Sequence, residues 1–126
     1  MARLYLGLAF FPKDPAYRHL CMVLSDPERA PKVVRANVSS QPCPSGEIFV
    51  LEKTHHSALS HRSYLRFQGA SLSPAAAISE GIDSGVLQQT KDLDAAICRE
   101  IQRQLGNSKY VKNEVVKMLR EQGYLD

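Results

Sequence analysis

Three polar residues near the ends of two apolar segments have side chains that suit a phosphate group. Arg18 precedes the first segment, and Ser39 and Ser40 end the second, which is rich in valine. If the two segments are neighbouring strands, the guanidinium and the hydroxyls converge at one end of a sheet. Such donors hydrogen-bond phosphodiester oxygens and stabilise charge that develops there. The alternative is that Arg18 is a solvated charge and both serines form a turn.

The four histidines are the side chains suited to proton transfer near neutral pH. His19 adjoins Arg18, so it is either a hydrogen-bonded strand residue or a proton-transfer group beside a bound phosphate. His55, His56 and His61 share one polar stretch, and their spacing matches no zinc motif. We interpret these three as surface loop histidines, and we expect neither a metal ion nor a cofactor.

The three cysteines are an odd number at wide spacing, which argues against a disulfide framework. Cys21 and Cys98 fall in apolar patterns and are expected to be small core residues. Cys43 lies between two prolines in a loop, and we interpret it as having no chemical role.

Length and composition indicate one domain over residues 1–126. The chain is 44% hydrophobic and 23% charged, which excludes a wholly disordered or membrane-embedded protein. The formal net charge of +3 is compatible with a nucleic-acid partner without requiring one. No apolar run approaches the roughly 20 residues that span a bilayer. We therefore expect a cytoplasmic protein that does not associate with membranes.

Short apolar segments bounded by turn residues predict a β-rich part over residues 1–70. The expected strands are Arg3–Phe11, His19–Leu24, Lys32–Val38, Glu47–Leu51 and Ser63–Phe67. The second segment is continuously apolar, which favours a strand buried on both faces in the middle of the sheet. Ser39–Gly46 is rich in serine and proline and predicts a loop. The short spacing favours antiparallel pairing.

The helical part is expected over residues 74–126. Pro74 opens a short helix over the alanines, which Gly81 closes. Thr90 and Gly106 bracket a helix whose apolar residues recur at helical spacing, and Ser108 caps another. The predicted fold is therefore mostly β with C-terminal helices, in the α+β class.

Three segments between Arg18 and Phe67 follow a pattern known from one protein family. Residues 18–25 (RHLCMVLS) place an arginine before an apolar run that ends in serine, and residues 33–40 (VVRANVSS) end in two serines. Residues 59–67 (LSHRSYLRF) place a serine before a short apolar strand. In this order the segments resemble the MazF/PemK family of toxin ribonucleases. The resemblance implies a small SH3-like antiparallel barrel, here followed by two amphipathic helices.

The same resemblance implies a metal-independent endoribonuclease that cleaves single-stranded RNA. The substrate 2′-hydroxyl attacks the adjacent phosphate and leaves a cyclic phosphate. Arg18 falls on the family's catalytic arginine, a proton donor and charge stabiliser, and Ser39 on a threonine that hydrogen-bonds the scissile phosphate. His19, Ser40 and Gln41 are then expected to bind the substrate. The resemblance also implies the toxin of a toxin-antitoxin pair, a homodimer whose RNA groove is occupied by a small antitoxin protein.

A second interpretation is a non-catalytic SH3-like barrel module that binds nucleic acid or a protein partner. A phage or mobile-element accessory protein would fit this description. In that case Arg18 contributes affinity and no chemistry. One fold hosts many functions, so the sequence pattern leaves both interpretations open.

Overall fold

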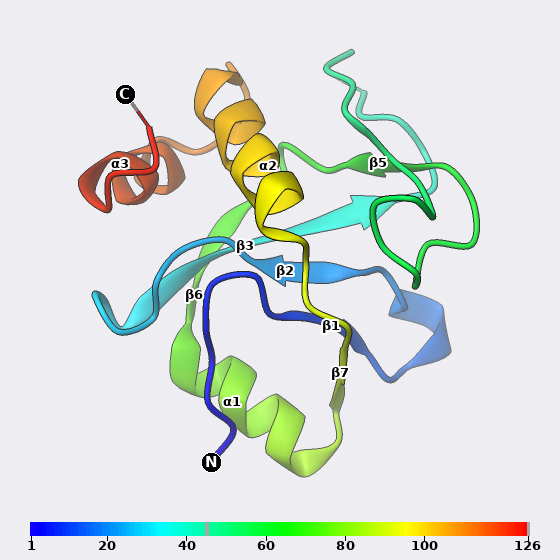
Figure 1. The fold of residues 1–126 in the computed structure, drawn as a ribbon, viewed down its shortest axis with the longest axis vertical. Coiled ribbons are helices and arrows are strands. Elements are labelled where there is room, and N and C mark those ends of the chain that lie inside the picture. The colour runs from blue at the N-terminus through cyan, green and yellow to red at the C-terminus, as the bar shows by residue number, and fades with distance from the viewer. Residues whose placement is uncertain (45, 126) are drawn as a thin grey trace.

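Seven strands form one mostly antiparallel sheet in the computed structural model, which describes residues 1–44 and 46–125 (Figure 1). The strands are β1 (Ala9–Pro12), β2 (Cys21–Val23), β3 (Lys32–Ser39), β4 (Val50–Leu51), β5 (Ser63–Leu65), β6 (Ser71–Pro74) and β7 (Leu87–Thr90). Three α-helices accompany them among these residues, α1 (Ala75–Ser84), α2 (Ala95–Asn107) and α3 (Asn113–Glu121), with a short 3-10 turn η1 at Pro15–Tyr17. The α+β class is confirmed.

The strand β3 is the centre of the sheet. The strand order is β4-β5-β3-β2-β1-β7, and β6 also pairs with β3. One edge of β3 takes β2, and the other takes β6 along its first half and β5 at its last two residues. Because β4 and β7 stand at the two ends of this order, the sheet formed by the described residues does not close. The SH3-like barrel is therefore not confirmed.

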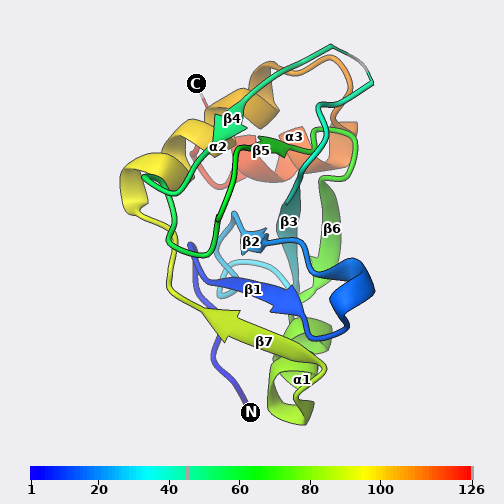
Figure 2. The same ribbon diagram turned by 90° about the vertical axis from the view of Figure 1, so that its right-hand side faces the viewer.

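The helix α1 connects β6 and β7, which lie on opposite sides of β3 in the strand order. Successive antiparallel pairings make β6 and β7 parallel to each other, and parallel neighbours in sequence need a crossover connection. In Figure 2, α1 makes this crossover connection at the bottom of the view, and α2 and α3 lie together at the top. No helix in the described part of the chain has the length and apolar character needed to cross a membrane.

Alternation along β3 separates the two hydrophobic clusters. Val34 and Val38 belong to the larger cluster, which includes Ile101 of α2 and Leu119 of α3. Val33 points to the other face, into the smaller cluster that Ile78 of α1 completes. Because successive side chains of a strand point to opposite faces of the sheet, β3 contributes side chains to both hydrophobic clusters. β2 lies between β1 and β3 and is wholly buried, as the sequence predicts.

The first strand is shorter than expected because Gly7 turns the chain. Gly7 has a φ of +94°, in the left-handed region that glycine adopts without strain. Its amide donates to the Val23 carbonyl at 2.9 Å, and its own carbonyl accepts from the Leu93 amide at 2.8 Å. β1 therefore starts at Ala9, and the prediction of a strand from Arg3 was wrong at that end. Of the apolar residues before the turn, Leu4 still packs in the core, whereas Tyr5 and Leu6 are exposed.

The predicted loop over residues 39–46 contains no helix or strand after Ser39 among its described residues, and residue 45 lies outside them. The predicted helical part also contains strand, since β7 lies between α1 and α2.

Two glycines that were expected to end helices lie inside them. Gly81 is within α1, which ends at Ser84, and Gly106 is within α2. A Cβ on Gly106 would lie 2.6 Å from a methyl carbon of Leu125, so glycine here permits close approach of the C-terminal segment. The helix starts also differ from prediction, because Thr90 ends β7 and α3 begins five residues after Ser108.

Candidate active site

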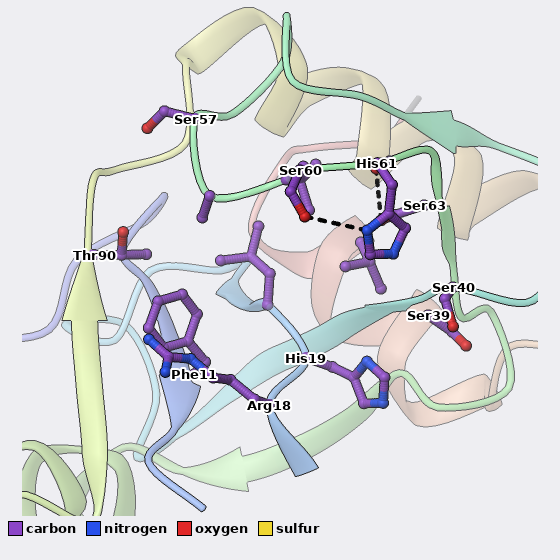
Figure 3. Close-up of a pocket in the computed structure, with 14 residues that line it drawn as sticks. Phe11, Arg18, His19, Ser39, Ser40, Ser57, Ser60, His61, Ser63 and Thr90 are labelled. Carbon is purple, nitrogen blue, oxygen red and sulfur yellow. Dashed lines mark hydrogen bonds between the residues drawn. The ribbon is translucent and has the colours of Figure 1, made fainter. Parts of the chain in front are cut away.

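A cleft of about 670 Å³ opens at the end of β3 (Figure 3). Its polar lining consists of one arginine, two histidines, five serines and one threonine, without a carboxylate. These are Arg18, His19, Ser39, Ser40, Ser57, Ser60, His61, Ser63 and Thr90, and the apolar lining is Phe11, Leu20, Val38, Ala58 and Leu59. The lining thus offers hydrogen-bond donors and positive charge with no fixed negative charge.

The antiparallel pairing of β3 explains why these residues meet. β2 and β5 both run antiparallel to β3, so both begin at the end where β3 stops. Val38 donates to the Leu20 carbonyl at 3.0 Å, which places His19 beside Ser39, and Ser39 pairs with Tyr64 on the other side. β2 and β3 are neighbouring strands, which meets the condition under which Arg18 and Ser39 were expected to come together.

Arg18 stacks on an aromatic ring. Its guanidinium carbon lies 4.6 Å from the centre of the Phe11 ring, and the side chain is exposed. Among the described residues it has no hydrogen-bond or ion-pair partner. Figure 3 shows the guanidinium at the Phe11 and Thr90 end of the cleft, whereas Ser39 and Ser40 lie at the opposite end. Arg18 and Ser39 therefore share a cleft but do not converge on one point of it.

The end of β3 presents two hydroxyls with different surroundings. Ser39 is half-buried, and its Oγ accepts a hydrogen bond of 3.2 Å from the Gln41 amide. This hydrogen bond is of the kind that forms a turn, which is the alternative role of Ser39 expected from the sequence. The oxygen only accepts in it, so the hydroxyl proton is available to a ligand. Ser40 is exposed and lines the cleft. Gln41, expected to bind substrate, lies outside the cleft lining.

His61 is a cleft residue that the sequence interpretation missed. Its ring is exposed, and its Nδ1 lies 3.2 Å from the Ser60 Oγ. The signal that could have identified it is position, because His61 precedes β5 by two residues just as His19 precedes β2. Both strands begin at the end of β3, so both histidines arrive at the cleft.

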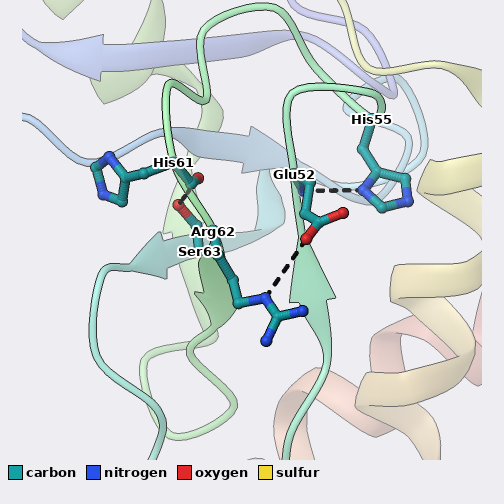
Figure 4. A network of polar contacts seen from close by, with 5 residues as sticks. All are labelled: Glu52, His55, His61, Arg62 and Ser63. Carbon is teal, nitrogen blue, oxygen red and sulfur yellow. Dashed lines mark hydrogen bonds and ion pairs between the residues drawn. The ribbon is translucent and has the colours of Figure 1, made fainter.

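Short-range polar contacts hold the segment that carries His61 (Figure 4). The Ser63 hydroxyl donates to the His61 carbonyl at 3.3 Å. The Arg62 Nε lies 3.4 Å from Glu52 Oε1, and the Glu52 amide donates to Nδ1 of His55 at 2.9 Å. Arg62, the arginine next to His61, thus pairs with the Glu52 carboxylate and does not line the cleft.

His56 is buried, so its interpretation as a surface histidine was wrong. The ring is 4% exposed, its Nε2 lies 2.6 Å from the Lys91 carbonyl, and its Nδ1 accepts from the Ala58 amide at 3.0 Å. Because a carbonyl only accepts and an amide only donates, Nε2 is the donor of the ring and Nδ1 the acceptor. His56 thereby fixes one wall of the cleft to the segment before α2.

The three cysteines are free and buried, and none lines the cleft. Burial raises the pKa of the Cys98 thiol to about 11. Burial also raises the pKa of Cys21, against an opposing effect of the nearby Arg35 guanidinium. Cys43 is buried, although predicted in a loop, and its thiol donates to the Leu65 carbonyl at 3.3 Å. These thiols are packing residues and poor nucleophiles.

No three His, Cys, Asp or Glu side chains in residues 1–44 and 46–125 are grouped so that they could hold a metal ion. Comparisons with protein-family models, curated proteins and solved structures find no match to this chain. The functional inference therefore depends on the cleft and on the sequence pattern.

Proposed function

We propose that this chain is a metal-independent endoribonuclease that cleaves single-stranded RNA through the substrate 2′-hydroxyl. The supporting observation is the cleft lining, which combines an arginine, two histidines and six hydroxyl side chains without a carboxylate. Phosphate oxygens accept hydrogen bonds from such donors, and no fixed negative charge repels them. The three segments that resemble the MazF/PemK family all contribute to this lining.

Each end of the cleft has a chemistry that suits one part of a nucleotide. At one end Ser39 and Ser40 offer hydroxyl protons to the non-bridging oxygens of the scissile phosphate. At the other, the half-buried Phe11 ring with Arg18 stacked on it forms a flat, positively charged platform. Unpaired bases stack on such aromatic and guanidinium surfaces, whereas duplex bases are not free to do so. This favours a single strand that lies along the cleft.

The reaction is an internal transesterification. The 2′-oxygen forms a bond to phosphorus, the bond from phosphorus to the 5′-oxygen breaks, and the products carry a 2′,3′-cyclic phosphate and a 5′-hydroxyl. Negative charge builds on the non-bridging oxygens in the transition state. Fixed donors aimed at those oxygens lower the barrier. In this proposal Ser39 donates a hydrogen bond to those oxygens, and Arg18 supplies positive charge from the opposite end of the cleft.

The biological part of the proposal rests on the family resemblance. The chain acts in the cytoplasm as the toxin of a toxin-antitoxin pair, as a homodimer, and a small antitoxin protein covers the RNA-binding surface. Expression of the chain alone then stops growth, and co-expression of the small protein encoded beside it restores growth. Unimpaired growth with folded, abundant protein would contradict the toxin assignment.

One observation favours a second candidate, a non-catalytic module that binds RNA. Arg18 stacks on Phe11 at the end of the cleft opposite Ser39, a position that suits binding of a base better than contact with the scissile phosphate. In this case the protein binds single-stranded RNA in the cleft and releases it intact.

Incubation with a long single-stranded RNA in EDTA separates the two candidates. We expect discrete fragments from the wild-type protein and a loss of about tenfold to hundredfold in rate at limiting RNA for Arg18→Ala, because stacking of a base on such a platform contributes roughly 1–3 kcal/mol. Arg18→Lys retains part of the rate, and Arg99→Ala, an exposed arginine of α2 outside the cleft, retains all of it. Intact RNA bound by folded wild-type protein would establish the binding module instead.

A further inference from the structure

Cleavage through a 2′-hydroxyl requires two proton transfers. A base removes the proton of the 2′-hydroxyl, and an acid protonates the departing 5′-oxygen. The titratable side chains among the residues that line the cleft are Arg18, His19 and His61. A guanidinium stays protonated in proteins, so Arg18 is not a base. The histidines are the side chains of this lining that can exchange protons near neutral pH.

The strand order places the two histidines on either side of β3. His19 precedes β2 and His61 precedes β5, and both strands flank β3 and begin at its end. Neighbouring strands lie about 4.8 Å apart, so the two backbones entering these strands are separated by about 10 Å. A separation of this size is wide enough for a phosphate group with its two ester oxygens. Figure 3 shows both rings toward the Ser39 and Ser40 end of the cleft.

The other two histidines, His55 and His56, do not line the cleft. His56 is buried with both ring nitrogens bonded to the backbone, and Nδ1 of His55 accepts from the Glu52 amide. His19 and His61 are exposed to the cleft, and neither ring contacts a carboxylate in the described chain. Arg62, next to His61, pairs with Glu52.

We propose that His19 and His61 are the general base and general acid of the reaction, an assignment that rests on the proposed function. One neutral imidazole takes the proton of the 2′-hydroxyl as the 2′-oxygen bonds to phosphorus. The other, as imidazolium, gives its proton to the 5′-oxygen as that bond to phosphorus breaks. One proton is gained and one lost, so the pair returns to its starting state after exchange with water. Arg18 then supplies charge alone.

Ser60 is the positioning residue of this pair. Its Oγ lies 3.2 Å from Nδ1 of His61. When Nδ1–H donates to Ser60, the Nε2 lone pair is free to accept a proton from the substrate. The contact thus holds the His61 ring in place and leaves its Nε2 free to exchange a proton with the substrate, as an orienting partner does for other catalytic histidines.

The test compares His19→Ala and His61→Ala with His55→Ala, a loop histidine outside the cleft. General acid and base groups each contribute about a hundredfold or more. We expect each cleft variant to lose about that much cleavage rate and His55→Ala to lose almost none. Affinity for a 2′-deoxy analogue, which binds but lacks the nucleophile, should change less than about threefold in the variant that lacks the base, because a neutral imidazole makes no charged contact with the phosphate.

Two further measurements separate proton transfer from binding. Added imidazole should restore part of the rate in each cleft variant. RNA with sulfur in place of the scissile 5′-oxygen releases a thiolate that needs no proton, so it restores the variant that lacks the acid and leaves slow the variant that lacks the base. Cleavage at the wild-type rate by both folded variants, or losses that follow affinity and resist imidazole, would overturn the pair while leaving the ribonuclease proposal intact. A wild-type protein that cleaves no RNA would contradict both the catalytic histidine pair and the ribonuclease proposal.

Discussion

Replacing His56 by alanine tests whether the cleft wall is fixed by a buried imidazole. The substitution removes the hydrogen bonds to the Lys91 carbonyl and from the Ala58 amide, together with the packing of a side chain that is 4% exposed. A hydrogen bond contributes about 1 kcal/mol net, and an unpaired buried partner costs more. Ala58 and Lys91 are exposed residues and both hydrogen bonds are only partly buried, so we take the low end of the range. Two bonds plus lost packing give about 2–3 kcal/mol.

Urea unfolding at neutral pH measures this loss, with His55→Ala as the matched control. His55 is half-buried and its ring accepts one hydrogen bond, so its replacement should cost about 1 kcal/mol or less. A domain of this kind is stable by roughly 5–15 kcal/mol, so both variants remain folded. Cleavage by His56→Ala should also fall, because the wall from Ser57 to His61 loses its anchor. Equal destabilisation by the two variants would refute the role given to His56.

Three further predictions concern the core and the helices. Gln102→Leu removes the 2.9 Å hydrogen bond from Gln102 Nε2 to the Leu24 carbonyl and should cost about 1–3 kcal/mol in urea unfolding, because that carbonyl stays buried; an unchanged midpoint would contradict this. Gly106→Ala should raise the melting temperature by less than the helix-propensity gain of about 1 kcal/mol implies, since the new Cβ displaces the Leu125 side chain, and in a Leu125→Ala background the full gain should appear. For Cys98, burial raises the folded-state pKa from 9.0 to about 11, so the unfolded thiol loses its proton first and stability is lost as the pH rises between these values. The loss should reach roughly 2–3 kcal/mol relative to Cys98→Ala, at about 1.4 kcal/mol per pH unit, and parallel pH profiles for the two proteins would be inconsistent with it.

The central strands were predictable because their signals are local. The apolar run of β2 and the alternation of β3 determine which side chains are buried, and a turn at Ser25 to Pro27 separates the two segments. Burial of both faces follows from those residues alone. In contrast, β6 and β7 are short polar segments that become strands by pairing with β3 and β1. Nothing in their own composition favours strand, so their existence depends on partners distant in sequence.

Some features of the candidate site could likewise be predicted from the sequence, and others could not. That Arg18 and Ser39 share a cleft followed from the pairing of two strands recognisable in the sequence. The place of His61 depends on β5 pairing with the end of β3, and the burial of His56 depends on the Lys91 carbonyl. Those contacts join distant parts of the chain, and a polar stretch with three histidines does not encode them locally. The stacking of Arg18 on Phe11 was likewise invisible, because it crosses the turn between β1 and β2.

The most direct test of the ribonuclease proposal is the chemistry of the fragment ends. Wild-type protein and single-stranded RNA are incubated in EDTA, and the products are analysed by mass spectrometry beside an RNA whose riboses are all 2′-deoxy. We predict 2′,3′-cyclic phosphate and 5′-hydroxyl ends from the RNA and no cleavage of the deoxy strand. Fragments with 3′-hydroxyl and 5′-phosphate ends, cleavage of the deoxy strand, or RNA left intact by folded protein would contradict the proposal.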